Sequence, residues 1–345
     1  MATRRHAENT ASQALLSAQR MSSSPTQLTP VRVYFLGSGC LGVPILDALR
    51  TDSRVELVGI GSQEDKEVGR KKQVTPTAFA QHALKLGYDV ERIHSVNTPE
   101  FLERLRSRQV ELVLVVAFGQ LLKRELLELP PRGCLNVHAS LLPKYRGACP
   151  INAAILNGDA VTGVTFMRMD VGLDTGPVYR TQSLEILPDE TTGQLEKRLG
   201  ALAANHAAEV IWQVARENLP CQPQGPATTP NVRKIAKNDG QIQWSQDASR
   251  IVNMVRAYQP WPKAFTFIPV PNGRRRVQVT QAAAEPYLLG EKEIPGTLLP
   301  DRKTLRVLCG NGILRIEKLT PEGRTEMSAE EFLRGNPVDA KIVLG

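Results

Sequence analysis

Val31-Arg-Val-Tyr-Phe-Leu-Gly-Ser-Gly-Cys-Leu-Gly42 is the stretch that decides the fold. Its first six residues are mostly apolar and β-prone, and three glycines follow within the next six. Helix-forming sequence then resumes at Val43–Arg50, so the stretch predicts a buried strand, a tight glycine turn and a helix. Such a unit is typical of α/β sheets, whose ligands bind at the carboxyl ends of the strands.

The alternation of strand and helix continues downstream. Further strands are predicted at Val55–Ile60, Leu112–Ala117 and Cys134–His138, and helices at Thr77–Lys85 and Glu100–Arg108. Buried apolar strands that alternate with helices predict a Rossmann-like, doubly wound parallel sheet. A long helix over Thr192–Ala215 follows, and the three-residue spacing of Thr191 and Gln194 is that of a capping box.

The last third of the sequence has a different pattern. Four prolines between Pro220 and Pro230 predict a stiff linker. After a predicted helix at Ala248–Ala257, short apolar segments predict strands of a small, OB-like β-barrel, at residues 264–270, 275–281, 304–309 and 312–319. We therefore expect a disordered extension (1–30), an α/β catalytic domain (31–216), a Pro-rich linker (217–236) and a C-terminal β-barrel domain (237–345).

Composition excludes several classes of protein. The chain has 345 residues, of which 41% are hydrophobic and 23% charged, which excludes a wholly disordered protein. Its apolar runs are far shorter than the roughly 20 residues of a membrane span. Five scattered cysteines without a Cys-x-x-Cys pair indicate a reducing compartment. We expect a cytoplasmic location, with an organellar matrix as the alternative because residues 1–30 are rich in Ser and Arg and poor in acids.

The positive charge is concentrated in one stretch. The net charge is +8, and residues 231–280 carry nine basic and two acidic side chains. Two interpretations stay open at this point, because a basic cluster is either a solvated face or a surface that binds nucleic acid phosphates.

The glycine turn itself suggests a nucleotide. Gly37-Ser-Gly39-Cys-Leu-Gly42 is formally the G-x-G-x-x-G fingerprint, so an NAD-dependent oxidoreductase is one candidate. That fingerprint also needs an acid at the end of the second strand, where this chain has Gly59-Ile-Gly61-Ser62. A plain tight turn between strand and helix is therefore favoured.

A second motif carries the stronger chemical signal. Asn136 and His138 share one face at the end of a predicted strand, because side chains alternate along a strand. An amide and an imidazole side by side suit the stabilisation of an oxyanion. Asp174, in a glycine-rich loop, is the candidate for orienting His138 and keeping it protonated. The five histidines do not cluster, so no metal site is predicted.

These motifs together resemble the folate-dependent formyltransferase family. The resemblance rests on Asn136-Val-His138, Ser140-Leu-Leu-Pro143, Arg146-Gly147, Gly163-Val-Thr165 and Asp170-Val-Gly-Leu-Asp174-Thr-Gly176, and extends from about Val31 to the C-terminus. It implies a catalytic trio of Asn136, His138 and Asp174, with 10-formyltetrahydrofolate as formyl donor and no metal. It also implies a folate site formed by Phe118, Gly119, Leu121, Ser140, Leu141, Leu142 and Pro143.

The resemblance also suggests the acceptor. Within the family, the linker, the second domain and the basic stretch favour transfer to the α-amino group of initiator methionyl-tRNA. The tRNA would contact Arg70, Lys71 and Lys72 in a basic loop and Arg274, Arg275 and Arg276 in the barrel. We expect a monomer with no stable protein partner. An amino-sugar nucleotide is the alternative acceptor.

Overall fold

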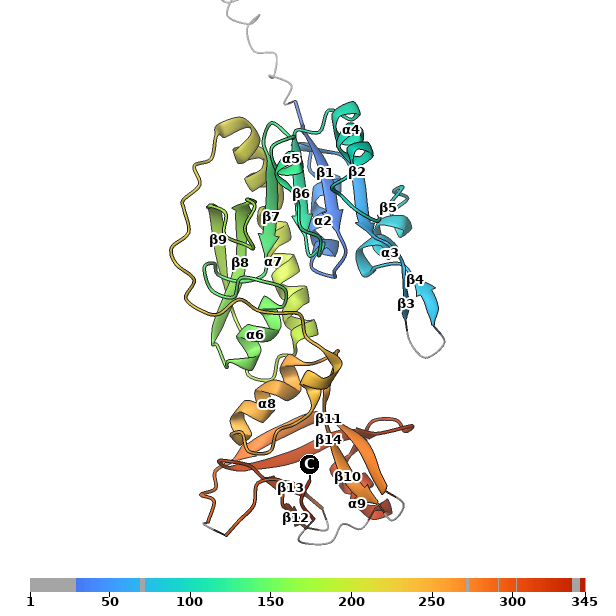
Figure 1. Cartoon of the computed structure of the whole chain (residues 1–345), viewed down its shortest axis with the longest axis vertical. Helices are drawn as coiled ribbons and strands as arrows, with labels where there is room; N and C mark the ends of the chain where they lie inside the picture. The colour runs from blue at the N-terminus through green and yellow to red at the C-terminus, as the bar shows by residue number, and fades with distance from the viewer. Residues whose placement is uncertain are drawn as a thin grey trace, which may run out of the picture.

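The structure is a computed structural model that describes residues 29–68, 72–270, 273–290, 292–301, 303–336 and 342–344. Apart from Thr29 and Pro30, the extension expected at residues 1–30 lies outside this described part. Two regular units follow one another along the chain, an α/β unit and a mostly β unit, and an extended segment joins them (Figure 1). In the described residues, no helix is both long and apolar enough to cross a membrane.

The α/β unit contains the predicted strands and helices and several more. Its strands are β1 (Val31–Gly37), β2 (Val55–Gln63), β3 (Lys66–Val68), β4 (Gln73–Thr75), β5 (Glu91–Ile93), β6 (Leu112–Val116), β7 (Cys134–His138), β8 (Val161–Arg168) and β9 (Val178–Glu185). Its helices are α2 (Gly42–Thr51), α3 (Ala78–Lys85), α4 (Pro99–Ser107), α5 (Arg124–Leu127), α6 (Pro150–Leu156) and α7 (Thr192–Trp212), which continues as a π-helical turn over Gln213–Glu217. Residues 191 and 194 form the predicted capping box.

The main sheet is parallel over most of its width. Its strand order is β5-β2-β1-β6-β7-β8-β9, and the first five strands run parallel. The last two strands run antiparallel, so the predicted parallel sheet is confirmed over most of its width and has an antiparallel edge. The physical reason is the path of the chain after β7, where a loop and the short α6 bring β8 back in the opposite direction.

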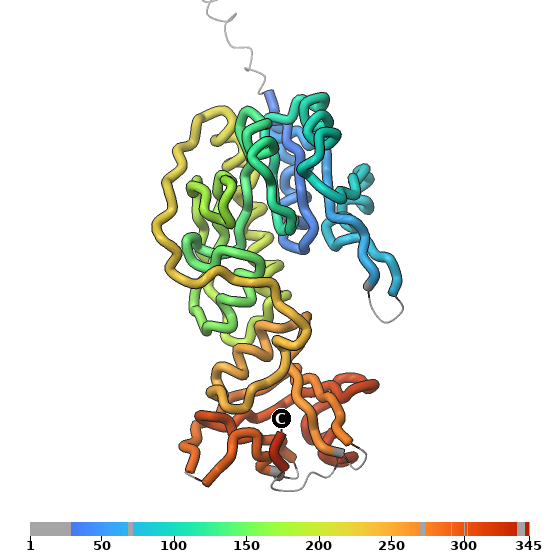
Figure 2. Tube along the Cα trace, in the orientation of Figure 1, coloured from blue at the N-terminus to red at the C-terminus, as the bar shows by residue number. Residues whose placement is uncertain are grey.

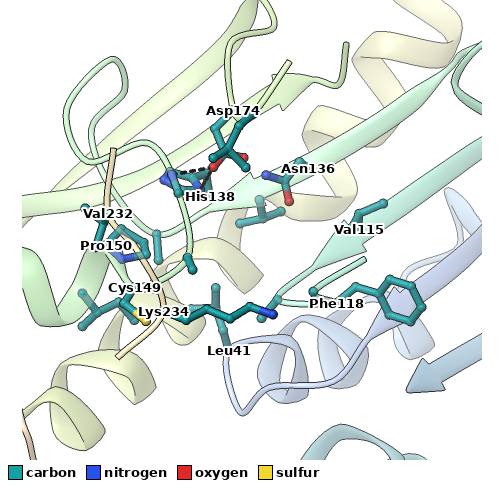
Figure 3. A pocket seen from close by; sticks show the side chains of 18 of the residues that line it. Leu41, Val115, Phe118, Asn136, His138, Cys149, Pro150, Asp174, Val232 and Lys234 are labelled. Carbon is teal, nitrogen blue, oxygen red and sulfur yellow. Dashed lines mark hydrogen bonds and ion pairs between the residues drawn. The ribbon is translucent and has the colours of Figure 1, made fainter. Parts of the chain in front are cut away.

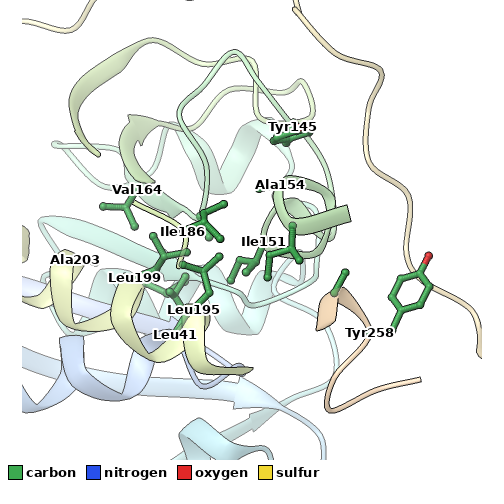
Figure 4. Packing of buried hydrophobic residues seen from close by; sticks show 14 of the residues in the cluster. Leu41, Tyr145, Ile151, Ala154, Val164, Ile186, Leu195, Leu199, Ala203 and Tyr258 are labelled. Atoms are coloured by element: carbon green, nitrogen blue, oxygen red, sulfur yellow. The ribbon is translucent and has the colours of Figure 1, made fainter. Parts of the chain in front are cut away.

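Helices cover both faces of the sheet, as a doubly wound fold requires. Alternate residues of β1 enter two different cores, because strand side chains point to opposite faces. Val33 and Phe35 join a large core with α2, α3 and α7, whereas Tyr34 and Leu36 join a smaller core with α4 and α5. Figure 4 shows α7 packed into the large core.

The C-terminal unit is a curled antiparallel sheet with α-helices packed against it (Figure 1). It contains α8 (Ala248–Ala257), β10 (Ala264–Val270), β11 (Gly273–Glu285), β12 (Leu298–Pro300), β13 (Leu305–Leu308), β14 (Ile313–Pro321), β15 (Met327–Ser328) and α9 (Ala329–Gly335). The predicted class, an α/β sheet followed by a small barrel-like β unit, is confirmed. Asn152 Nδ2 and Thr192 Oγ1 both donate to the carbonyl of Ala257, at 2.7 Å, and so tie α8 to α6 and α7.

The segment between the two units is not a free spacer. It runs along the outer edge of the α/β unit, next to β9, and then crosses toward α8 (Figure 2). Its backbone pairs with the α/β unit at two points, where Gln222 bridges Val178 and Val232 bridges Gly147. These contacts bring linker residues to the carboxyl ends of the strands, where the candidate site lies.

Candidate active site

One pocket of about 690 Å³ lies at the carboxyl ends of β6 and β7. Its walls come from the turn after β1, the segment after β6, the end of β7, two loops and the linker (Figure 3). Asn136, His138 and Asp174, the predicted catalytic trio, all line this pocket.

Strand β7 presents Asn136 and His138 together. The two side chains are 8% and 6% exposed and lie on the same face of the strand, as their spacing predicted. Figure 3 shows both near Asp174. Burial in a pocket wall matters here, because a hydrogen-bond donor is worth more in a site that excludes water.

Two loops hold the histidine. His138 Nε2 lies 3.0 Å from the carbonyl oxygen of Tyr145, and Nδ1 lies 3.6 Å from Asp174 Oδ2. The same carboxylate oxygen accepts a hydrogen bond of 2.8 Å from the backbone N–H of Gly147. The turn at residues 145–147 therefore orients both members of the His138–Asp174 pair.

These contacts decide which imidazole nitrogen carries the proton in the neutral ring. A carbonyl oxygen can only accept a hydrogen bond, so the Tyr145 contact requires a proton on Nε2 of His138. The other ring nitrogen, Nδ1, then faces Asp174. In its protonated form His138 offers an N–H donor at Nδ1.

The predicted folate residues divide into two groups. Phe118, Gly119 and Leu121 line the pocket, with the Phe118 ring packed in the smaller core and Leu121 exposed at the rim. Ser140, Leu141, Leu142 and Pro143 are not among the described residues that line it. They build the neighbouring turn, in which Ser140 Oγ donates to the carbonyl of Lys144 at 2.6 Å and the backbone N–H of Leu142 donates to Thr165 Oγ1 at 3.1 Å.

The predicted tRNA residues lie on two parts of the molecule. Arg70 and Lys71 lie outside the described residues, and Lys72 is exposed at the β3–β4 hairpin, 3.8 Å from Glu67. On β11, the side chain of Arg274 is exposed.

The other two predicted tRNA residues have contacts within the C-terminal unit. Arg275 Nη1 donates to Asn336 Oδ1 at 3.3 Å. The Arg276 guanidinium lies 3.8 Å from the centre of the Phe265 ring. Arg276 therefore has a packing role in the sheet.

The glycine turn after β1 is occupied by a carboxylate of the chain itself. Glu196 Oε1, on α7, accepts a hydrogen bond of 3.2 Å from the backbone N–H of Leu41, at the start of α2. Burial raises the pKa of Glu196, against the effect of backbone hydrogen bonds from Leu41 and Cys40. In a dinucleotide enzyme the pyrophosphate occupies this position, where it would be repelled by Glu196. The geometry therefore argues against the NAD alternative.

Sequence reasoning missed several residues of the pocket. Glu196 lines it from α7, and Val232, Arg233 and Lys234 line it from the linker. Lys234 is drawn across the pocket in Figure 3. A Pro-rich segment has no apolar period, so its docking left no signal in the pattern. Within the described ranges, no group of three or more His, Cys, Asp or Glu side chains could hold a metal ion.

Two known families match separate stretches of the chain. Residues 31–211 match the formyl transferase family, and residues 234–337 match the formyl transferase C-terminal domain. The chain belongs to the formyl transferase family. Known relatives of this formyl transferase include the methionyl-tRNA formyltransferase of Geotalea daltonii, 38% identical over 91% of the chain and 98% of the relative. That of Alkaliphilus oremlandii is 36% identical over 91% of the chain and 100% of the relative.

Solved structures support the fold of this formyl transferase. The N-formyltransferase of Helicobacter canadensis has a TM-score of 0.59 at 18% identity, over 83% of the chain and 98% of that protein. HypX of Aquifex aeolicus has a TM-score of 0.57 at 17% identity, over 91% of the chain and 51% of that protein.

Proposed function

We propose that this formyl transferase moves the formyl group of 10-formyltetrahydrofolate to the α-amino group of initiator methionyl-tRNA. The observation that carries the proposal is the pocket in which Asn136, His138 and Asp174 meet. Relatives that are 36–38% identical over 91% of the chain, and are matched over 98–100% of their own length, are methionyl-tRNA formyltransferases.

The reaction needs a place for negative charge and a route for one proton. The amine nitrogen attacks the formyl carbon, and the carbonyl oxygen gains charge as the new C–N bond forms. The bond from the formyl carbon to N10 of the folate then breaks. The amine loses one proton and N10 gains one, so the transfer releases no net proton and moves no electrons between redox states.

The trio fits these needs in distinct roles. Asn136 Nδ2 and the Nδ1–H of protonated His138 are the donors to the oxyanion, and such donors are worth about 3–4 kcal/mol each. Asp174, whose Oδ2 lies 3.6 Å from the same nitrogen, orients the ring and accepts a proton or relays it through water. The folate is a substrate here, held in the part of the pocket lined by Phe118, Gly119 and Leu121.

The acceptor requires a basic surface. Lys72, Arg274 and Arg275 offer cations from the hairpin and the C-terminal sheet, and Arg70 and Lys71 add charge to the hairpin sequence. We place the tRNA against these cations of the hairpin and the C-terminal sheet, with its methionine-bearing 3′ end in the pocket. We further propose that the enzyme works as a monomer in the cytoplasm.

A formylation assay with two acceptors tests the proposal. Purified protein and 10-formyltetrahydrofolate are incubated with initiator or elongator tRNA, each charged with methionine. We expect N-formylmethionine on the initiator tRNA and much slower reaction with the elongator. Release of formate with neither tRNA modified would contradict the proposal, as would transfer to an amino-sugar nucleotide in a parallel reaction.

A further inference from the structure

The linker touches the two loops that hold His138. One loop carries Tyr145 and Gly147, and the other carries Asp174. Tyr145 and Asp174 both adopt left-handed backbone conformations, with φ of 58° and 53°. Such conformations are strained for a non-glycine residue and persist only where the surroundings hold them.

The linker contributes hydrogen bonds to both residues. Thr229 Oγ1 accepts a hydrogen bond of 2.8 Å from the backbone N–H of Tyr145. Gln224 Nε2 donates to the carbonyl oxygens of Asp174, at 2.9 Å, and Gly176, at 2.7 Å. Each residue with left-handed backbone next to His138 therefore has its own hydrogen bond to the linker.

Gln224 also reaches the other loop. Its Oε1 accepts hydrogen bonds from Arg146 Nε, at 3.1 Å, and Nη2, at 2.8 Å. The Gln224 amide thus donates two hydrogen bonds to the Asp174 loop and accepts two from the Tyr145 loop. These four bonds use the full hydrogen-bonding capacity of a side-chain amide. The backbone of Val232 adds two more bonds, to the carbonyl of Arg146 and from the N–H of Ala148, both 2.7 Å.

We propose that Gln224 is a positioning residue for catalysis, which sets the geometry of the His138–Asp174 pair by clamping the two loops together. It touches neither reacting group, and acts through Arg146 and the backbone of Asp174. The inference rests on the proposed function, since it assigns Gln224 a part in the same formyl transfer. A change of about 1 Å in such a pair can cost on the order of 10²-fold in rate.

Gln224→Met tests the clamp, because methionine keeps the length of the side chain and removes its hydrogen bonds. The matched control is Gln222→Met, two residues away, since Gln222 is exposed and pairs with Val178 through its backbone. For Gln224→Met we expect kcat per folded molecule to fall about 10-fold or more, with KM for 10-formyltetrahydrofolate within about 2-fold. The control should match the wild type.

Two further readouts separate positioning from a merely structural role. Both Gln224→Met and Asp174→Asn alter the His138–Asp174 pair, so the pH profile of kcat should shift in the same direction in the two variants. A variant that merely contains less folded protein would have a lower kcat but a pH profile of unchanged shape. The ¹⁵N resonances of the His138 ring should also shift in Gln224→Met and stay in place in Gln222→Met. This second readout needs no turnover, so it tests the clamp even if the wild type fails to formylate tRNA and the proposed function falls.

A second variant covers the case in which Gln224→Met does not fold. Thr229→Val keeps the side-chain shape and removes the acceptor for the Tyr145 N–H, so it should lower kcat and move the ring resonances in the same way. Wild-type kcat, pH profile and ring resonances in the variant that folds would overturn the proposal. A loss confined to KM for tRNA would also overturn it, in favour of a linker that only binds tRNA.

Discussion

Asn136 and His138 are neighbours on one strand face, and their donors face one pocket. If both stabilise the oxyanion, Asn136→Ala and His138→Ala should each lower kcat by about 10²-fold or more. Steady-state formylation at saturating folate measures this, with the melting temperature as control for folding. A folded variant with near-native turnover would remove that residue from the mechanism.

Cys40 is a second test at the scale of single residues. Partial burial and the negative charge of Glu196 raise the pKa of Cys40, which lowers its thiolate fraction at any pH below that value. Because the thiolate is the reactive form, iodoacetamide should alkylate Cys40 at pH 8 more slowly than the cysteine of a short peptide. Glu196→Gln removes the negative charge and should speed the reaction.

Mass spectrometry of the modified peptide follows Cys40 separately from the other cysteines. Equal alkylation rates for Cys40 and the peptide, in the wild type, would show that the environment of the turn does not act on this thiol. Equal rates in wild type and Glu196→Gln would remove the contribution of the carboxylate alone.

Helices α2 and α7 approach closely at one glycine. A Cβ at Gly200 would lie 2.8 Å from Pro44 Cγ and 3.1 Å from the carbonyl oxygen of Leu41. Gly200→Ala gains roughly 1 kcal/mol of helix propensity, but overpacking of a core contact costs about 1–3 kcal/mol. We expect a net loss of stability, seen as a lower midpoint of urea unfolding.

Gly193→Ala is the control on the same helix. Its Cβ would have its nearest neighbour at 3.4 Å, an ordinary contact. This variant should be as stable as the wild type or more so. An unchanged midpoint for Gly200→Ala would mean that α2 can move away from α7 at little cost.

Among the strands, the sequence was most informative where the pattern is local. The apolar runs of β1, β6 and β7 and the period of two that pairs Asn136 with His138 were sufficient to predict those strands and the core of the site. Strand β9 was missed because its residues alternate between half-buried and exposed, with no apolar run. Strand β8 was not predicted either, and its antiparallel direction depends on the path of the chain after β7, which no residue pattern carries.

The salt dependence of tRNA binding tests whether the basic residues of β11 form a tRNA-binding surface. If Arg274 and Arg275 bind tRNA phosphates, replacing both with Gln should weaken binding and flatten the log–log dependence on salt. The slope should change by about 0.7–0.9 for each phosphate that the variant no longer neutralises. Arg276 is left in place because it packs on Phe265. Filter binding of initiator tRNA at several salt concentrations measures both effects.

The control variant removes the same number of positive charges from another part of the molecule. Arg106, on α4, and Arg124, on α5, are exposed on helices that cover the smaller core. Replacing these two with Gln should leave the salt slope unchanged. Equal slopes for the wild type and both double variants would identify the arginines of β11 as a solvated face.

Long-range docking is what the sequence could not supply. The contacts of Val232 run through backbone atoms, and those of Gln224 join loops about 50 and 78 residues earlier in the chain. Neither kind of contact leaves a local period or a motif, so the sequence predicted a stiff linker but not that the linker forms part of the pocket wall. The resemblance to the formyltransferase family predicted Asn136, His138 and Asp174, but not the linker contacts that hold the loops around them.

The return of the linker to the α/β unit also affects the order in which the enzyme is made. Synthesis runs from the N-terminus, and domains generally fold in that order. Asn136, His138 and Asp174, with the whole main sheet, therefore leave the ribosome before Gln224, Thr229 and Val232. A nascent chain that has just completed α7 has every strand of its main sheet but lacks the linker's hydrogen bonds to Tyr145 and Asp174. The enzyme would gain its activity late in its own translation, after its largest sheet has folded.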